Sequence, residues 1–228
     1  MLYFDPIYLM VMIPALLLSL LAQFLVSSAF SKWSRIRNSL GLTGVHVAER
    51  LIRGAGLNGV QLEGIPGQHT DHYDPASHTV RLSEEVATRP SVAAMAVVAH
   101  ELGHAQQHAE RSILISMRNF LLPAMQFSPM VSYLLILGGL LLNIAGLIQL
   151  GIVFYGVVVL FMVLTLPVEF DASRRGLIML RETGLMTTTE EIGGSRAVLT
   201  AAALTYVAAA VTAVLNLLYY ISLASRRD

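Results

Sequence analysis

The chain of 228 residues lacks cysteine altogether, and no run of basic residues is longer than two. Without cysteine it has no disulfides, no thiolate zinc ligands and no cysteine nucleophile. Its net charge is zero, so nothing in the composition suggests nucleic-acid binding. We therefore expect no thiol chemistry and no nucleic-acid partner, while the redox compartment stays undecided.

Charge is scarce as well. Charged residues make up 13% of the chain and hydrophobic residues 55%, whereas a soluble domain carries about a quarter charged residues. Residues 6–31, 119–168 and 197–225 contain no charge at all. An apolar helix needs about 20 residues to cross a bilayer, so the first and third stretches each hold one span and the middle stretch holds two. The sequence predicts a membrane protein.

The four spans are expected at about Ile7–Phe30, Pro129–Leu147, Ile152–Val168 and Ala197–Leu223. A tight turn between the second and third spans is expected at the polar and glycine cluster Asn143, Gly146, Gln149 and Gly151. The first stretch has no basic residue before it, is longer than the apolar core of a signal peptide, and is followed at once by Lys32. It is therefore predicted to be a retained anchor.

Residues 31–118 have an ordinary soluble composition and hold all seven histidines. Helices are predicted at Thr43–Arg53, which Gly54 ends, and at Ser91–Glu110. Val60–Ile65 and the alternating Thr79–Ser83 are predicted strands, with turn-forming residues at 73–77 between them. We expect Thr79–Ser83 to form a sheet edge with one exposed side, where it would hold a substrate backbone in extended form.

The second predicted helix contains His100-Glu101-Leu102-Gly103-His104, an H-E-x-x-H motif. Residues four apart lie on one helix face, so both imidazoles can bind one zinc ion. Glu101 is rotated by about 100° from His100 and reaches a water molecule on the metal instead. Zinc lowers the pKa of such a water to about 7, and a carboxylate beside it accepts the proton. The motif predicts zinc-dependent hydrolysis with Glu101 as the base.

The alternative is an ordinary exposed turn of helix that happens to carry polar residues. The motif follows the apolar run Ala93–Ala99, which favours burial. Two histidines and a glutamate in the interior are costly without a metal. The zinc site is therefore the favoured interpretation.

A catalytic zinc needs a third protein ligand and one open coordination position. The metzincin pattern would have glycine at 107 and histidine at 110, but the chain has Gln107 and Glu110, which excludes that class. A glutamate on a later helix is the other solution. The best candidate is Glu169, which stands where the third span ends.

Other carboxylates compete with Glu169 for this role. Asp171 is the main rival, and the less favoured candidates are Glu182, Glu190 and Glu191. The alternative for Glu169 itself is an ion pair with Arg174 or Arg175. A hairpin of two spans separates His104 from Glu169, so both return to the same membrane face, as a shared site requires.

Further histidines surround the motif. A second metal site is the bolder interpretation of the cluster His69, Asp71, His72, Asp74 and His78, and satisfied surface groups are the plainer one. His72 or Tyr73 is also a candidate donor to the oxyanion. His108, four residues beyond His104, either supports a ligand or points to solvent, and His46 receives no role.

Four strings carry a family resemblance: residues 70–75 (TDHYDP), 80–83 (VRLS), 99–105 (AHELGHA) and 166–173 (LPVEFDAS). They resemble the YugP-type neutral zinc metallopeptidases of bacteria, over nearly the whole chain. More distantly the chain is similar to the HtpX and CAAX prenyl protease group of membrane gluzincins, in which an aspartate follows the ligand glutamate by four residues. The resemblance implies zinc peptidase chemistry with Glu169 as a ligand. Ser173 stands at the +4 position, so Asp171 is left as the candidate supporting group.

These features predict a mainly α membrane protein with about four transmembrane helices and a small α+β zinc-peptidase domain, whose H-E-x-x-H helix is completed by a glutamate after the third span. The expected segments are residues 1–30 (first transmembrane helix), 31–118 (peptidase domain), 119–168 (transmembrane hairpin), 169–196 (third-ligand helix and loop) and 197–228 (last transmembrane helix and tail).

We expect a membrane-embedded metallopeptidase that holds one Zn²⁺ per chain through His100, His104 and Glu169 and hydrolyses peptide bonds with a zinc-activated water. The alternative is an inactive zinc-binding membrane scaffold that docks partner proteins, although a scaffold has no need for Glu101. A transporter is disfavoured because the spans hold few polar residues. The expected partners are the lipid bilayer and peptide or protein substrates, membrane proteins among them.

Orientation follows from the basic residues near the span ends. On the domain side these are Lys32, Arg35, Arg37, Arg111, Arg118, Arg174, Arg175, Arg181 and Arg196, and on the opposite side only Arg226 and Arg227. The bias predicts a multi-pass protein of the cytoplasmic membrane with its active site on the cytoplasmic side and both termini outside.

Overall fold

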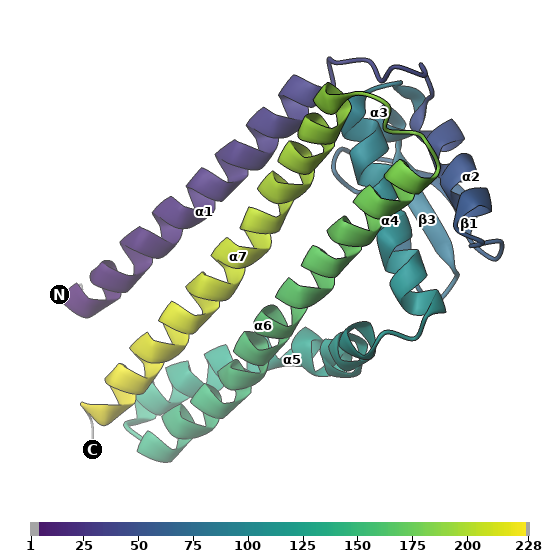
Figure 1. The fold of residues 1–228 in the computed structure, drawn as a ribbon. Coiled ribbons are helices and arrows are strands. Elements are labelled where there is room, and N and C mark those ends of the chain that lie inside the picture. The colour runs from purple at the N-terminus through teal and green to yellow at the C-terminus, as the bar shows by residue number, and fades with distance from the viewer. Residues whose placement is uncertain (1–4, 227–228) are drawn as a thin grey trace. The chain divides into compact units, whose positions relative to one another are not determined.

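The computed structural model describes residues 5–226, and Arg227 of the expected C-terminal basic pair lies outside them. Helices and strands follow one another in the order α1 (Pro6–Trp33), α2 (Gly44–Gly54), β1 (Gln61–Ile65), β2 (His72–Asp74), β3 (Thr79–Ser83), α3 (Glu84–Thr88), α4 (Val92–Ala109), α5 (Ile113–Leu142), α6 (Ala145–Glu182) and α7 (Thr189–Ser225) (Figure 1).

The described chain falls into two compact units. The helical unit comprises residues 5–23, Ser116–Pro167 and 205–226, and the α+β unit comprises Phe24–Ile115 and Val168–Leu204. Every residue of the predicted metal site lies in the α+β unit, which is therefore where the chemistry must be sought.

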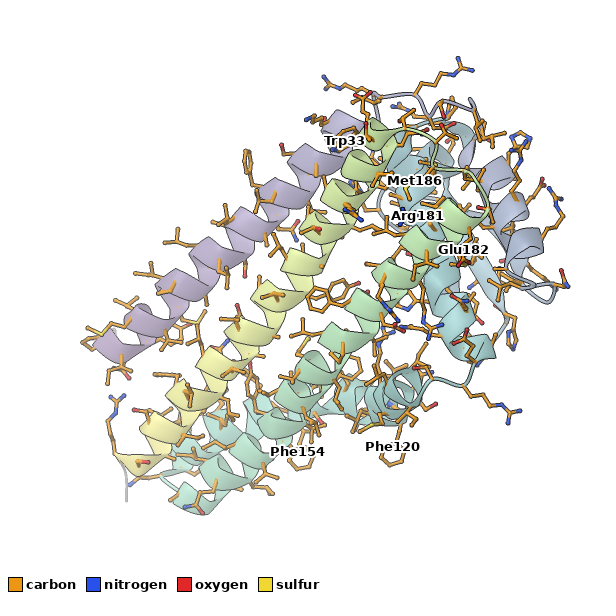
Figure 2. All side chains as sticks on the ribbon, viewed as in Figure 1. Trp33, Phe120, Phe154, Arg181, Glu182 and Met186 are labelled. Carbon is orange, nitrogen blue, oxygen red and sulfur yellow. The ribbon has the colours of Figure 1, made fainter. Side chains whose placement is uncertain are left out.

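Four of the helices, α1, α5, α6 and α7, are 28 to 38 residues long and apolar enough to cross a membrane. This confirms the predicted number of candidate spans and the mainly helical fold. Large apolar side chains stand exposed along them, as a lipid-facing surface requires. Phe120, for example, is 82% exposed, and Figure 2 shows the rings of Phe120 and Phe154 projecting from their helices.

The hairpin between α5 and α6 is tighter than predicted. α5 runs to Leu142 and α6 begins at Ala145, so the turn consists of Asn143 and Ile144 alone. Asn143 adopts a left-handed φ of 57°, which asparagine tolerates at a helix C-terminus. Gly151 was expected in the turn but lies inside α6, where a Cβ would come within 2.6 Å of the Ile136 side chain. The glycine therefore serves close packing of the two helices.

The sheet has the order β1-β3-β2, with β1 parallel and β2 antiparallel to β3. The expectation that Thr79–Ser83 forms an edge with one exposed side is wrong, because β3 is central and only Arg81 of its five residues is not buried. The missed partner is the three-residue strand β2, whose residues Tyr73 and Asp74 were assigned to a turn. A strand this short shows no alternation from which it could be recognised.

Arg81 ties the three strands together. Its guanidinium donates to Asp74 Oδ2 on β2 at 2.9 Å and to Glu63 Oε2 on β1 at 3.0 Å. Hydrogen bonds from Arg81, and then from Ser77, hold the pKa of the Asp74 carboxyl well below its usual range. One central cation thus links both edge strands to β3.

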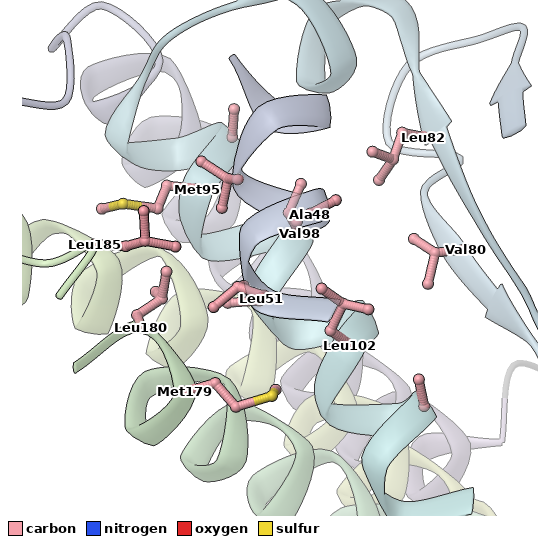
Figure 3. Close-up of a cluster of buried hydrophobic side chains, with 14 of the residues drawn as sticks. Ala48, Leu51, Val80, Leu82, Met95, Val98, Leu102, Met179, Leu180 and Leu185 are labelled. Atoms are coloured by element: carbon pink, nitrogen blue, oxygen red, sulfur yellow. The ribbon is translucent and has the colours of Figure 1, made fainter. Parts of the chain in front are cut away.

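The hydrophobic core of the α+β unit is built around α4. Buried side chains from α2, β3 and α6 meet it, among them Leu51, Leu82 and Leu180, as the close-up in Figure 3 shows. Met95 and Leu102 of α4 are 1% and 0% exposed. The predicted helix Ser91–Glu110 is observed as α4, with the Ser91 hydroxyl accepting from the Ala94 N–H at its start. Leu102 therefore anchors the motif helix in the core by a face other than that of its histidines.

Candidate metal centre

The two motif histidines lie one turn apart on α4 and face a carboxylate on α6. His100 Nε2 is 3.2 Å and His104 Nε2 is 3.5 Å from Glu169 Oε2. Ligands about 2.0–2.1 Å from a tetrahedral zinc are separated by about 3.3 Å, so these distances suit one shared ion. Within residues 5–226 this is the one group of at least three His, Cys, Asp or Glu side chains with metal-binding geometry.

Two glycines allow α4 and α6 to approach closely enough for the two histidines to meet Glu169. A Cβ on Gly103 would collide with the backbone oxygen of Ala172, and a Cβ on Gly176 would collide with that of Ala99. Gly103 lies inside the motif, and Gly176 lies two turns beyond Glu169. Any other residue at either position would move the two helices apart and withdraw Glu169 from the histidines.

The tautomer of His104 is fixed by Gln107, a fully buried side chain. The Gln107 amide NH₂ donates to the Val168 carbonyl and to Asp171 Oδ2, each at 2.9 Å. Both amide hydrogens are thereby used, so Oε1 must face His104 Nδ1, which lies 3.1 Å away. Because an oxygen can only accept there, Nδ1 carries the proton and Nε2 presents a lone pair to the site.

His100 is oriented by Ser173. Its Nδ1 lies 3.0 Å from the Ser173 hydroxyl, which leaves Nε2 facing Glu169. The serine at the +4 position therefore contacts one histidine directly, and Asp171 supports the other through Gln107. Such partners of ligating histidines fix ring orientation and raise metal affinity. Sequence reasoning missed the role of Gln107, although its spacing of three from His104 on one helix was a usable signal.

The centre requires a cation. Glu169 Oε2 is buried and no hydrogen bond reaches it, yet two imidazole nitrogens lie within 3.5 Å of it. Burial lowers the pKa of His104, but the adjacent Glu169 carboxylate outweighs burial and leaves the pKa above its ordinary value. A divalent ion between the three atoms would meet this need. The donor set of two imidazoles and one carboxylate fits zinc.

The Glu101 carboxylate is not one of the three converging groups and is held by β2. Its Oε2 accepts a hydrogen bond from the Tyr73 N–H at 2.9 Å, and the residue is only 8% exposed. No other residue of the described chain donates to the second oxygen, Oε1. A backbone donor on a strand thus fixes the carboxylate, and one oxygen is left for proton transfer.

The remaining histidines form other contacts. The Tyr73 hydroxyl lies 3.2 Å from His78 Nδ1 and 2.9 Å from His108 Nδ1, so it is already engaged. Burial, reinforced by His78, holds the pKa of His108 below its ordinary value. His72 Nδ1 bonds to the Thr70 carbonyl. Among the described residues, those proposed for a second metal site do not converge on one point.

The rivals of Glu169 are engaged elsewhere. Asp171 pairs with Arg175 at 2.6 Å, and Arg175 also bonds Glu110 at 2.6 Å. Glu191 accepts hydrogen bonds from Ser39, Thr187 and Thr188 at the start of α7. Glu182 and Glu190 are exposed and outside the metal-binding group. Glu169 is thus the carboxylate that the structure brings to the two histidines, and it is not paired with Arg174 or Arg175.

Residues 8–225 match a protein family described as "Putative neutral zinc metallopeptidase". The chain belongs to this family. It is also 43% identical over 215 residues to a Bacillus subtilis (strain 168) protein named "Putative membrane protease YugP", an alignment that covers 94% of this chain and 95% of that protein. No solved structure matches the chain. The family resemblance expected from the sequence is confirmed.

For a neutral zinc metallopeptidase the metal would be zinc, and the donors described above suit it. The four apolar helices and the name of the relative agree on a membrane protein. The family match therefore supports zinc and peptidase chemistry in general, while the particular ligands and base rest on the geometry of this chain.

Replacing Gly176 with alanine tests the close approach of α4 and α6. The added methyl would push against the Ala99 backbone and displace Glu169, so we expect Gly176→Ala to lower zinc affinity by at least about tenfold, as other indirect perturbations of zinc sites do. Gly156→Ala in the same helix is the matched control, because its Cβ would meet nothing within 4 Å. Competition with a fluorescent chelator measures both affinities, and equal values would contradict the packing argument.

Replacing Gln107 with leucine tests the orientation of His104. The substitution removes the acceptor at Nδ1 and leaves the Val168 carbonyl and Asp171 without their donor. We expect Gln107→Leu to weaken Zn²⁺ or Co²⁺ binding about 10–100-fold and to change the visible spectrum of bound Co²⁺. Gln106→Leu makes the same change one residue away and should leave both unaltered. An unchanged cobalt spectrum in Gln107→Leu would remove the orienting role.

Proposed function

We propose that the chain is a membrane-embedded zinc metallopeptidase in which His100, His104 and Glu169 bind one Zn²⁺ per chain and Glu101 is the general base. One observation carries this proposal: two imidazole nitrogens converge on a buried carboxylate oxygen at 3.2 and 3.5 Å, with Glu101 on the next position of the same helix. Membership of a zinc metallopeptidase family supports the reaction class.

A zinc ion in this centre would lower the pKa of a water molecule and polarise the scissile carbonyl. The residues supply the rest. Glu101 is held through Oε2 by the Tyr73 N–H, so Oε1 takes the proton from the attacking water and passes it to the leaving amine. His100 keeps 14% of its side chain exposed, which leaves the centre accessible on one side. No covalent intermediate with the protein is needed.

The substrates we propose are peptides or proteins, including membrane proteins, and the lipid bilayer is the other partner. Four helices long and apolar enough to span a membrane support the multi-pass location. We place the segments as residues 1–30, 31–118, 119–168, 169–196 and 197–228, with the second and fourth supplying the zinc ligands. The excess of basic residues on the domain side supports a cytoplasmic active site.

Two substitutions separate catalysis from metal binding. Glu101→Gln keeps the hydrogen bond from Tyr73 but cannot accept a proton, so we expect zinc content near that of the wild type and turnover reduced by about 10²–10⁴-fold. Glu169→Ala should lose both turnover and bound zinc. Elemental analysis and hydrolysis of a quenched fluorescent peptide library in detergent measure the two properties.

The same experiment distinguishes the alternative function. Retained turnover in Glu101→Gln would overturn the base assignment, and full zinc occupancy in Glu169→Ala would overturn the third ligand. A wild-type protein that binds zinc but cleaves no peptide of the library, with Glu101→Gln indistinguishable from it, would favour the inactive scaffold that docks partner proteins.

The proposed orientation is testable because the chain has no native cysteine. Glu85→Cys introduces a single thiol on α3 of the α+β unit. We expect a membrane-impermeant maleimide to label it only after the cells are opened. Asp5→Cys is the control for the opposite side of the membrane. Labelling of position 85 in intact cells would reverse the proposed orientation.

A further inference from the structure

A basic cleft lies between α6 and α7 within the α+β unit, and none of the three converging residues His100, His104 and Glu169 lines it. A cavity of about 220 Å³ is lined by Arg174, Arg181 and Arg196 together with apolar side chains such as Leu177 and Met186. Figure 2 labels Arg181, near the end of α6, and Met186, in the loop that joins α6 to α7. Three arginines therefore line one small space together with apolar side chains.

A second cavity of about 280 Å³ continues this cleft. It shares Arg174, Leu177 and Arg196 with the first, extends over Phe170 and Leu199, and reaches Ser173, the partner of His100. The cleft is thus cationic at one end and apolar at the other. A third hollow also reaches Arg196 and is lined by Lys32 and Trp33 of α1. Arg196 lines all three.

Two of the three arginines have no acidic partner in the described part of the protein. Among residues 5–226 no carboxylate lines any of the three cavities, and no ion pair joins Arg181 or Arg196 to an acidic side chain. Arg174 lies 3.4 Å from Asp171, but that carboxylate already bonds Arg175 at 2.6 Å. Three gathered cations that share a single carboxylate with Arg175 favour an anionic ligand, and arginine forks bind phosphate oxygens in pairs.

The position along the chain indicates where this ligand comes from. Arg196 directly precedes the uncharged stretch 197–225, and Lys32 directly follows the uncharged stretch 6–31. Both therefore stand at the ends of candidate membrane spans, the depth at which lipid headgroups lie. A ligand with an anionic head and an apolar tail matches the cleft from one end to the other.

We propose that this cleft binds one anionic phospholipid, with the phosphate between Arg174, Arg181 and Arg196 and an acyl chain along Leu177, Phe170 and Leu199. An acidic peptide segment is less suited. At 100° per residue Arg181 lies about 120° round α6 from Glu169, so the cationic end of the cleft lies on a different face of the helix from Glu169.

The single tryptophan provides the measurement, because Trp33 lines a hollow together with Arg196. The full chain is reconstituted in phosphatidylcholine nanodiscs that contain a fixed minor fraction of brominated phosphatidylglycerol or of brominated phosphatidylcholine. Excess quenching of Trp33 by the anionic lipid measures its relative affinity. We expect clear excess quenching in the wild type and a roughly fivefold loss of relative affinity in each of Arg174→Gln, Arg181→Gln and Arg196→Gln.

Arg35→Gln is the matched control, since it removes the same charge from an exposed residue that lines none of the three cavities. It should keep the excess quenching, and Arg196→Lys should keep most of it. Equal quenching by the two lipids in the wild type, or an equal loss in Arg35→Gln and Arg196→Gln, would overturn the site.

Quenching by a nitroxide-labelled acidic peptide in the absence of anionic lipid, without any preference for that lipid, would assign the cleft to peptide instead. The readout needs neither zinc nor turnover, so it is independent of the proposed function.

Discussion

The arrangement of the α+β unit depends on one buried carboxylate that faces two imidazoles. Glu169 Oε2 has no hydrogen bond, and it stays in the interior only because a cation, whether proton or metal, can lie between it and the histidines. That constraint explains the features around it. The glycines at 103 and 176 let α4 and α6 touch, and Gln107 and Ser173 turn the two rings so that both Nε2 atoms point inward.

The core and the polar centre share one helix, which keeps the centre rigid. Leu102 of α4 packs with Leu51 and Leu82 in the core, while His100 and His104 occupy another face. The sheet acts on the same helix from a further side, because the Tyr73 N–H on β2 holds Glu101. The proposed base and the proposed metal ligands are therefore positioned by helices and a strand rather than by loops, as precise chemistry requires.

The sequence predicted the parts of this arrangement that depend on local spacing. The i, i+4 histidines, the four apolar spans and the helix Ser91–Glu110 all follow from helix period and composition. Glu169 was singled out because a span ends there, because a two-span hairpin returns it to the face of His104, and because the family resemblance implies it. The strand β2 and the central position of β3 were missed. Pairing between residues 72–74 and 79–81 depends on the rest of the fold, and a strand of three residues is too short to show an alternating pattern. Gln107 was used only to exclude a metzincin, since its buried contacts with Val168 and Asp171 join segments about sixty residues apart.

Neither of the two histidines is contacted directly by an aspartate. An aspartate beside His100 would place a second negative charge next to the buried Glu169, near Glu101. Instead a neutral hydroxyl meets His100, and Asp171 reaches His104 only through the Gln107 amide while its charge is balanced by Arg175. The negative charge at the centre is therefore that of Glu169 and Glu101 alone. With a divalent ion bound, these two carboxylates would balance it, and in a low-dielectric interior such neutrality favours retention of the ion.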